Sequence, residues 1–214
     1  MQIGNLCLWA IIEGIAVYLL FSKGKLFCSE EVENDYKKRW VGLGIFVLFA
    51  MVSGWIVGSS AQSILDCIKL LTIFVVFSLA ALTDIKSYII PNSLVLALIG
   101  IRCLLSVAEF FWAKDNWIYQ IKVSLVGGVL SLVIFLIISI ITKGGFGMGD
   151  VKLLAAQGFM MGLYGVVNTF LYALLCCSVI ALILMATNKK KLKDKLPFAP
   201  FIFAGFIVSL ILGS

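Results

Sequence analysis

Long runs of apolar residues, separated by short charged loops, dominate this chain of 214 residues. Hydrophobic residues make up 62% of the sequence and charged residues 13%, whereas soluble domains average about half and about a quarter. A soluble protein of this composition would expose large apolar patches to water. The composition therefore excludes a soluble globular domain, a disordered chain and a small disulfide-rich protein, and it predicts a multi-pass membrane protein.

The net charge, the absence of histidine and the spacing of the cysteines restrict the kinds of partner, catalytic site and metal site that the chain can have. The formal net charge is +6, which we interpret as the lysine excess that orients a membrane protein, with no nucleic-acid partner. The chain has no histidine, so Ser-His-Asp and Cys-His catalytic arrangements and histidine-liganded metal sites are impossible. Its six cysteines form no C-x-x-C pair, and we therefore expect neither a metal nor another cofactor.

The apolar runs predict an all-α protein with about eight transmembrane helices, folded as a single membrane-embedded domain over residues 1–214. Residues 22–40 are expected to form a short cytoplasmic loop within it, and residues 113–122 a second polar loop. The run from Val151 to Ala186 is too long for one crossing at about 1.5 Å per residue, so we expect a turn at Gly162–Gly165. The predicted segments are Ile3–Phe21, Val41–Gly58, Ile68–Thr83, Ser93–Trp112, Val123–Ile141, two within Val151–Ala186, and Phe198–Leu212.

The distribution of basic residues supports this count. With the 22–40 loop in the cytoplasm, eight crossings place most of the 17 lysines and arginines on that side, including the run Lys189–Lys195. Seven crossings would place that run outside, against the positive-inside rule. The sequence thus predicts a multi-pass protein of the cell membrane, with this lysine run able to contact anionic lipid headgroups.

Two aspartates stand out among the ionisable residues of the apolar segments, because such groups are costly in a membrane and are functional candidates. The topology places Asp84 and Asp150 at cytoplasmic helix ends and at the same depth. Two carboxyl groups that meet there can share a proton, leaving one acid and one base to act on an amide. Each is also compatible with an ordinary role at a helix boundary. Arg102 and Glu109, seven residues apart, are expected to form a structural ion pair on one side of their helix.

The residues around these aspartates suit access by a peptide chain. Four glycines, Gly144, Gly145, Gly147 and Gly149, precede Asp150 and allow a close backbone approach. Pro91 favours an extended chain before Asn92, which we expect to cap the following helix. Lys152 is positioned either to stabilise a developing oxyanion or to anchor the chain at the cytoplasmic face.

Three short motifs resemble one family. The sequences Thr83-Asp84-Ile85-Lys86 with Ile90-Pro91-Asn92, then Gly147-Met148-Gly149-Asp150, then Leu196-Pro197-Phe198-Ala199-Pro200-Phe201 resemble, in this order, the type IV prepilin leader peptidases. These enzymes belong to the G-x-G-D class of membrane aspartyl proteases. The resemblance extends from about Thr83 to the C-terminus.

The resemblance implies that Asp84 and Asp150 are catalytic, with Gly147, Gly149, Lys152, Pro91, Asn92, Pro197 and Pro200 binding substrate or supporting the site. It implies a pilin-like precursor as substrate, whose short basic leader is cleaved at the cytoplasmic membrane face without a metal. The 22–40 loop holds only Cys28, so the chain resembles the short forms that lack the cysteine-rich methyltransferase region. Either aspartate can be the acid, and the oligomeric state is left open.

Three alternative functions are compatible with the same residues. A proton-coupled transporter would use the same aspartates as relay groups, although we find no inverted repeat. A non-catalytic scaffold of a secretion assembly would tolerate asparagine at both positions. A presenilin-like protease would cut within a membrane helix, but those enzymes carry tyrosine where this chain has Thr83.

Overall fold

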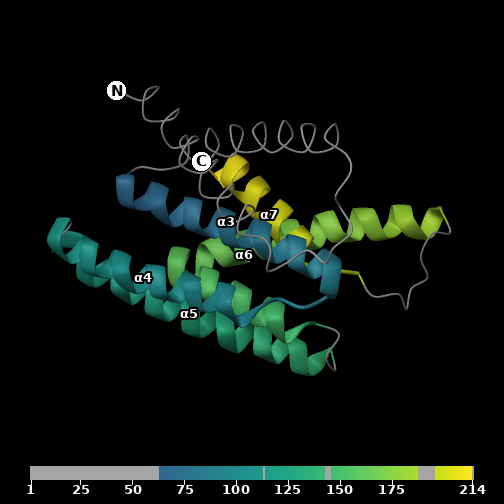
Figure 1. Ribbon diagram of the computed structural model, residues 1–214, viewed down its shortest axis with the longest axis horizontal. Coiled ribbons are helices and arrows are strands. Elements are labelled where there is room, and N and C mark those ends of the chain that lie inside the picture. Colours follow the sequence, from purple (N-terminus) through teal and green to yellow (C-terminus); the bar gives the residue numbers. More distant parts are fainter. Residues whose placement is uncertain (1–62, 113, 143–145, 188–195, 214) are drawn as a thin grey trace, which may run out of the picture. The chain divides into compact units, whose positions relative to one another are not determined.

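The computed structural model describes residues 63–112, 114–142, 146–187 and 196–213 (Figure 1). These ranges contain five helices and no strand, which confirms the all-α prediction for this part of the chain. The helices are α3 (Ile64–Ser87), α4 (Asn92–Trp112), α5 (Lys114–Ile141), α6 (Met148–Ala186) and α7 (Ala199–Gly213). The first two predicted segments, the 22–40 loop and the basic run Lys189–Lys195 lie outside the described residues.

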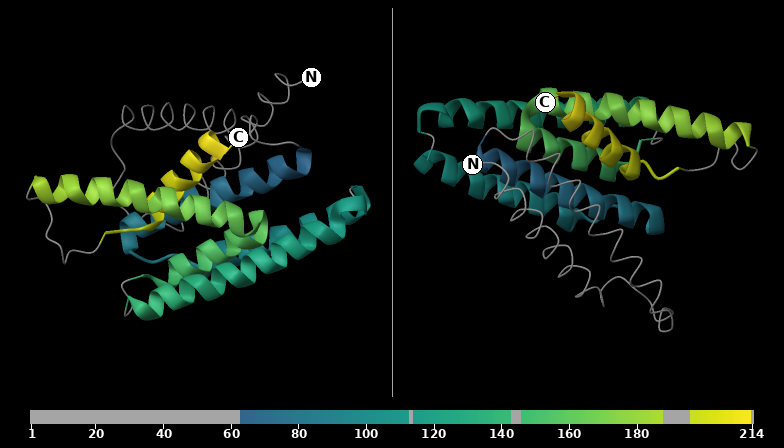
Figure 2. Two further views of the ribbon diagram at one scale, coloured as in Figure 1. Left: turned by 180° about the vertical axis from the view of Figure 1, so that it is seen from behind. Right: turned by 90° about the horizontal axis from the view of Figure 1, so that it is seen from above.

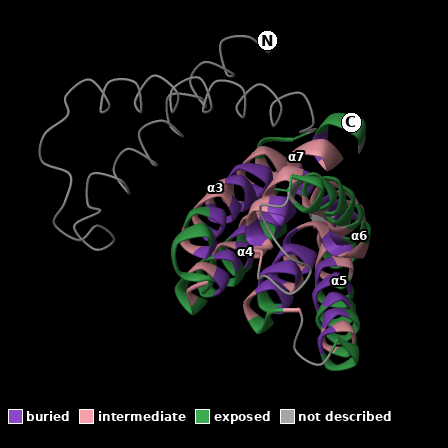
Figure 3. Ribbon diagram, turned by 90° about the vertical axis from the view of Figure 1, so that its right-hand side faces the viewer, coloured by how far each residue is buried: buried purple, intermediate pink, exposed green. Residues whose placement is uncertain are grey.

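Four of these helices are long and apolar enough to cross a membrane, and α7 is a shorter apolar helix. Large apolar side chains such as Val129, Val133 and Ile140 are exposed on their outer surfaces, while buried residues lie where the helices face one another (Figure 3). The molecule is therefore a multi-pass membrane protein, because lipid tails rather than water suit such an outer surface.

The count of eight helices is not supported by the structure. Two of the predicted segments fall outside the described residues, and the stretch predicted as two helices forms one element, α6, with a single break. The polar loop predicted at residues 113–122 is also wrong, since α5 already begins at Lys114. That stretch contains neither proline nor glycine to stop a helix, and the Trp117 Nε1–H donates to the Ser106 carbonyl 3.0 Å away, which fastens the start of α5 to α4.

Helix α6 folds back on itself at Gly162, whose φ of 78° and ψ of 178° are not helical. We call residues 148–161 its first arm and residues 163–186 its second arm (Figure 2). Gln157 on the first arm donates to Thr169 Oγ1 on the second over 2.7 Å, although 12 residues of straight helix would separate them by about 18 Å. The predicted turn at Gly162–Gly165 is thus confirmed, and it begins at the residue best suited to a positive φ.

Glycines allow the first arm of α6 to pack closely against α5. A Cβ atom added at Gly127 would lie 2.5 Å from Gly162 Cα and 2.7 Å from the Gly158 oxygen, and one added at Gly158 would lie 2.6 Å from the Gly127 oxygen. The two backbones are therefore in direct contact, the arrangement that small residues permit between membrane helices.

We expect Gly127→Ala to destabilise the protein by about 1–3 kcal/mol, because the added methyl group must push two backbones apart. Gly100→Ala is the matched control, since a Cβ there meets nothing within 4 Å, and it should be neutral or stabilising by up to about 1 kcal/mol. Thermal unfolding in detergent measures both. Equal melting temperatures for the two variants would contradict the close contact.

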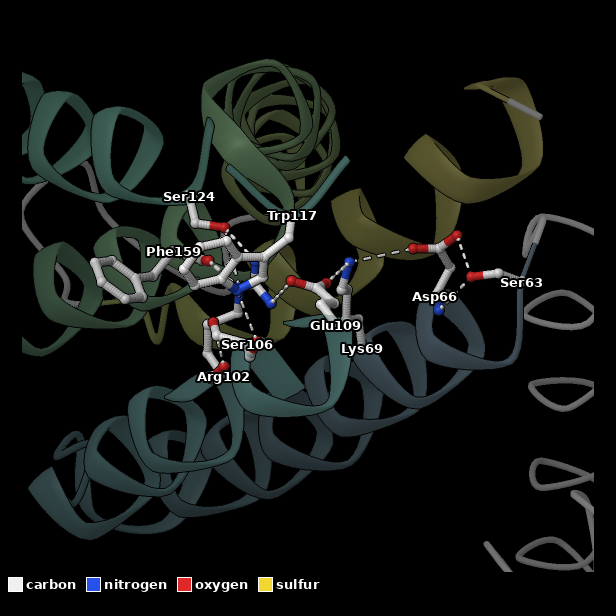
Figure 4. Close-up of polar contacts among 9 residues, drawn as sticks. All are labelled: Ser63, Asp66, Lys69, Arg102, Ser106, Glu109, Trp117, Ser124 and Phe159. Atoms are coloured by element: carbon white, nitrogen blue, oxygen red, sulfur yellow. Dashed lines mark hydrogen bonds and ion pairs between the residues drawn. The ribbon is translucent and has the colours of Figure 1, made fainter. Parts of the chain in front are cut away.

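A network of buried charges joins the helices away from the ends at which Asp84 and Asp150 lie (Figure 4). Arg102 is 1% exposed, and its Nη1 lies 3.0 Å from Glu109 Oε2, as the sequence predicts. Its guanidinium also donates to Ser124 Oγ and to the Phe159 carbonyl. Lys69 of α3 completes the network with its Nζ 2.7 Å from Glu109 Oε1, a partner that the sequence did not indicate.

Removing the shared carboxylate should be costly. Glu109→Ala leaves buried Arg102 without a carboxylate and Lys69 with only the partly exposed Asp66, and we expect a loss of about 3–5 kcal/mol. Asp66→Asn is the control, because the Asp66 side chain is 41% exposed at 3.3 Å from Lys69, and exposed pairs contribute at most about 1 kcal/mol. Thermal unfolding in detergent tests the contrast, and similar losses in both variants would show that burial does not decide the energetics here.

Candidate active site

Asp84 lies in the last turn of α3 and is buried. Its Oδ2 accepts a hydrogen bond of 3.0 Å from the backbone N–H of Ala199, the first residue of α7. This bond connects positions 115 residues apart in the chain. The carboxylate therefore holds the N-terminus of α7, where unpaired N–H groups and the helix dipole favour an anion.

Each of the first backbone N–H groups of α7 has a hydrogen-bond acceptor. Ala199 donates to Asp84, whereas the N–H groups of Phe201 and Ile202 donate to the Phe198 carbonyl. Pro200, between them, has no N–H to satisfy. That Pro200 and Pro197 support the site remains a prediction; in the structure, Pro200 leaves no orphan donor next to Ala199, and half-buried Pro197 precedes the helix.

Asp150 lies in the first turn of α6 and is also buried. Its Oδ1 has no hydrogen-bond partner among the described residues. Asp84 lies within electrostatic range of this carboxyl group, so the two aspartates that the sequence paired lie in the same region of the fold. Both carboxyl groups thus have a backbone donor, Ala199 for Asp84 and Gly147 for Asp150, but only Asp150 keeps an oxygen without a partner among the described residues.

The two glycines of the Gly-x-Gly-Asp motif make room for this arrangement. A Cβ added at Gly147 would lie 2.9 Å from Asp150 Oδ2, and one added at Gly149 would lie 3.1 Å from Cβ of Ile90. Gly147 therefore leaves space for the carboxylate, and Gly149 lets the connection between α3 and α4 pack against α6. Gly144 and Gly145 lie outside the described residues.

Lys152 and Asn92 contact each other rather than the aspartates. The Lys152 ammonium donates to Asn92 Oδ1 over 3.1 Å and is exposed. Two residues along a helix turn the side chain by about 200°, away from Asp150. The pair joins the start of α6 to the start of α4, which begins directly after Pro91; the Asn92 side chain accepts this lysine bond instead of capping its helix as predicted.

An aromatic cluster that the sequence did not indicate packs at the same end of the helices. The Phe146 ring lies 5.5 Å from that of Phe198 and 6.0 Å from those of Phe135 and Phe170. Phe146 directly precedes the glycine motif at Gly147–Asp150. Phe198 lies within the proline motif, between Pro197 and Pro200. That adjacency was the only available signal, because phenylalanine is common throughout the chain.

This arrangement is suited to hydrolysis by two carboxyl groups. A buried pair can hold a single proton between its members, so that one activates water while the other donates a hydrogen bond or a proton. Among the described residues, no three His, Cys, Asp or Glu side chains gather in a way that could hold a metal ion.

Comparison with known proteins identifies the family. Residues 70–182 match the type IV leader peptidase family. The chain belongs to this family. Asp84 and Asp150 both lie within the matched region, whereas the α7 residues that contact Asp84 lie beyond it.

Several relatives of the type IV leader peptidase family carry the name prepilin leader peptidase/N-methyltransferase. The Bacillus subtilis (strain 168) protein is 31% identical over 135 residues, which cover 63% of this chain and 52% of that protein. The Pectobacterium carotovorum subsp. carotovorum protein is 28% identical over 189 residues, 86% of this chain and 63% of the relative. The chain thus spans between about half and under two thirds of these relatives' lengths. No solved structure matches it significantly.

Removing each aspartate side chain should affect stability differently. Asp84→Ala leaves the buried N–H of Ala199 without an acceptor, and we expect a cost of about 1–3 kcal/mol. Asp150→Ala frees only the N–H of exposed Gly147, which water can satisfy, and it relieves the repulsion between the two carboxyl groups, so it should cost less. Thermal unfolding in detergent measures this, with Asp84→Asn as the control that retains an acceptor. An equal or larger loss in Asp150→Ala would contradict the assigned contacts.

Proposed function

We propose that this chain is an aspartic-type membrane endopeptidase that removes the short basic leader from pilin-like precursors. The observation that carries the proposal is that two buried carboxyl groups, Asp84 and Asp150, lie within electrostatic range of each other at one end of the helices in a chain of this family. The names of the relatives supply the substrate class. The reaction needs no metal and no cofactor.

In the proposed reaction, one carboxylate takes a proton from water as the water oxygen attacks the carbonyl carbon of the scissile peptide. The other carboxyl group gives its proton to the carbonyl oxygen, which yields a neutral diol. As the diol collapses, the second carboxylate takes back a proton from one hydroxyl, the C–N bond breaks, and the nitrogen takes a proton from the first carboxyl group, which restores the starting protonation of the pair. The products are the leader with a new carboxyl end and the mature protein with a new amino end.

We place this reaction at the cytoplasmic face of the cell membrane. Asp84 lies in the last turn of α3 and Asp150 in the first turn of α6, so both belong near the membrane surface rather than its midplane. Exposed Lys86 and Lys152 lie at the same helix ends, which is the side that the positive-inside rule assigns to the cytoplasm. Eight crossings are proposed on the same basis, counting the two arms of α6 and two segments before residue 63.

The test is cleavage of a co-expressed pilin-like precursor, followed by its change in size. Wild type should cleave it, and Asp84→Asn and Asp150→Asn should each abolish cleavage. Asp66→Asn is the matched control, an exposed carboxylate at the other end of α3, and should leave cleavage unchanged. Cleavage by either active-site variant, or none by wild type, would overturn the proposal.

Sequencing the new amino end separates this proposal from its nearest alternative. A cut just ahead of the hydrophobic helix of the precursor agrees with leader removal. A cut inside that helix would indicate the presenilin-like class of intramembrane proteases instead.

A further inference from the structure

Each of the two aspartates accepts a backbone hydrogen bond from a residue that directly follows a phenylalanine. For Asp84 the donor is Ala199, which follows Phe198. The Ala199 N–H belongs to the same planar peptide unit as the Phe198 carbonyl, and that carbonyl accepts from the N–H groups of Phe201 and Ile202. The position of Phe198 therefore sets the direction in which the donor to Asp84 points.

The donor to Asp150 is built in the same way. It is the N–H of Gly147, the residue after Phe146. The Phe146 carbonyl, in the same peptide unit, accepts from Ser139 Oγ over 2.9 Å, and the Phe146 N–H donates to Thr142 Oγ1 over 3.3 Å. Side chains at the end of α5 thus hold the backbone of Phe146, and with it the N–H that bonds to Asp150.

The rings of the two phenylalanines contact each other. The Phe146 and Phe198 centroids lie 5.5 Å apart with an interplanar angle of 69°, an edge-to-face contact. Phe170, on the second arm of α6, lies 6.0 Å from the Phe146 ring and 6.3 Å from the Phe198 ring. Aromatic contacts of this geometry stabilise beyond the apolar area that they bury. The rings therefore join the chain that precedes α6 to the chain that precedes α7.

This contact links the two carboxyl groups. A reaction that two groups carry out together depends on their relative position, and a displacement of about 1 Å can slow such a step about a hundredfold. Asp84 belongs to α3 and Asp150 to α6, so neither helix alone determines that position. Each carboxyl group is bonded to one of the two peptide units, and the ring contact joins these units to each other.

We propose that Phe146 and Phe198 are positioning residues, because the contact between their rings holds the two N–H donors, and through them the two carboxyl groups, in a fixed relation. This inference rests on the proposed peptidase function and adds two residues that act without touching the scissile peptide. Both are half-buried, so each can be replaced without opening the closed core of the helices.

Phe146→Leu and Phe198→Leu test the proposal, since each removes one ring and keeps an apolar side chain. The purified full chain in detergent is assayed with a pilin-like precursor. Each variant should lower kcat about tenfold, because the carboxyl groups lose their exact relation. KM should change less than about twofold, because binding is not affected. A raised KM with an unchanged kcat would show that the rings bind substrate, and it would overturn the proposal.

The double variant Phe146→Leu/Phe198→Leu tests whether the rings act through one contact. Either single substitution removes that contact, so kcat of the double variant should lie within about threefold of the lower single value. Losses that multiply would show two independent effects and contradict the proposal. Phe146→Tyr and Phe198→Tyr keep the ring and should retain at least about half of the wild-type kcat. Losses as large as those of the leucine variants would also contradict it.

Phe110→Leu is the matched control. The Phe110 ring meets that of Trp117 edge-to-face, with centroids 4.9 Å apart and an interplanar angle of 68°, but it lies near the other end of α4. This variant should lower the melting temperature without lowering kcat. Equal effects on kcat in all three leucine variants would indicate a general loss of stability and overturn the proposal. If wild type cleaves the precursor while these patterns fail, only this inference falls; if wild type does not cleave it, the proposed function falls as well.

Discussion

The hydrogen bond from the Ala199 N–H to the Asp84 carboxylate connects the architecture of this protein to its chemistry. A helix that starts within a membrane protein must satisfy its first N–H groups, and α7 has no side chain of its own that does so. A carboxylate from α3 takes that role. The same contact restrains the Asp84 carboxyl group, and this residue is also a candidate for catalysis. A family match that ends at residue 182 would not reveal that dependence.

Buried charged groups are well paired at one end of the described helices and poorly paired at the other. In the network around Arg102, both cations face Glu109, and the guanidinium has further acceptors on α5 and α6. At the aspartates, two carboxyl groups lie within electrostatic range and Asp150 Oδ1 has no partner among the described residues. The first arrangement offsets the cost of burying charge, whereas the second leaves that cost in place. A buried group with incomplete hydrogen bonding is expected where that group must stay available for a reaction.

Residue patterns predict those parts of the fold that depend on local physics. Apolar runs indicate α3, α4 and most of α5, and the length of the Val151–Ala186 run indicates the fold-back that Gly162 makes. The charged and polar residues at 113–122 led to the wrong prediction of a loop, because polar residues continue a helix when no proline or glycine interrupts it. The meeting of Asp84 and Asp150 follows from their helix ends, but the donor to Asp84 is a backbone group of an alanine, which has no signature in sequence. Lys152 stands two residues from Asp150, yet the turn of the helix directs it to Asn92.

The glycine motif before Asp150 is explained by what passes beside it. Gly147 leaves room for a carboxylate and Gly149 for Ile90, so the motif shapes a contact between α6 and the chain that leaves Asp84. The position of the non-helical stretch ended by Pro91 is set at both ends by neighbours of the two aspartates, because Tyr88 donates to the Asp84 carbonyl and Ile90 packs against Gly149. A side chain larger than that of glycine at position 149 would therefore displace the chain that leaves Asp84.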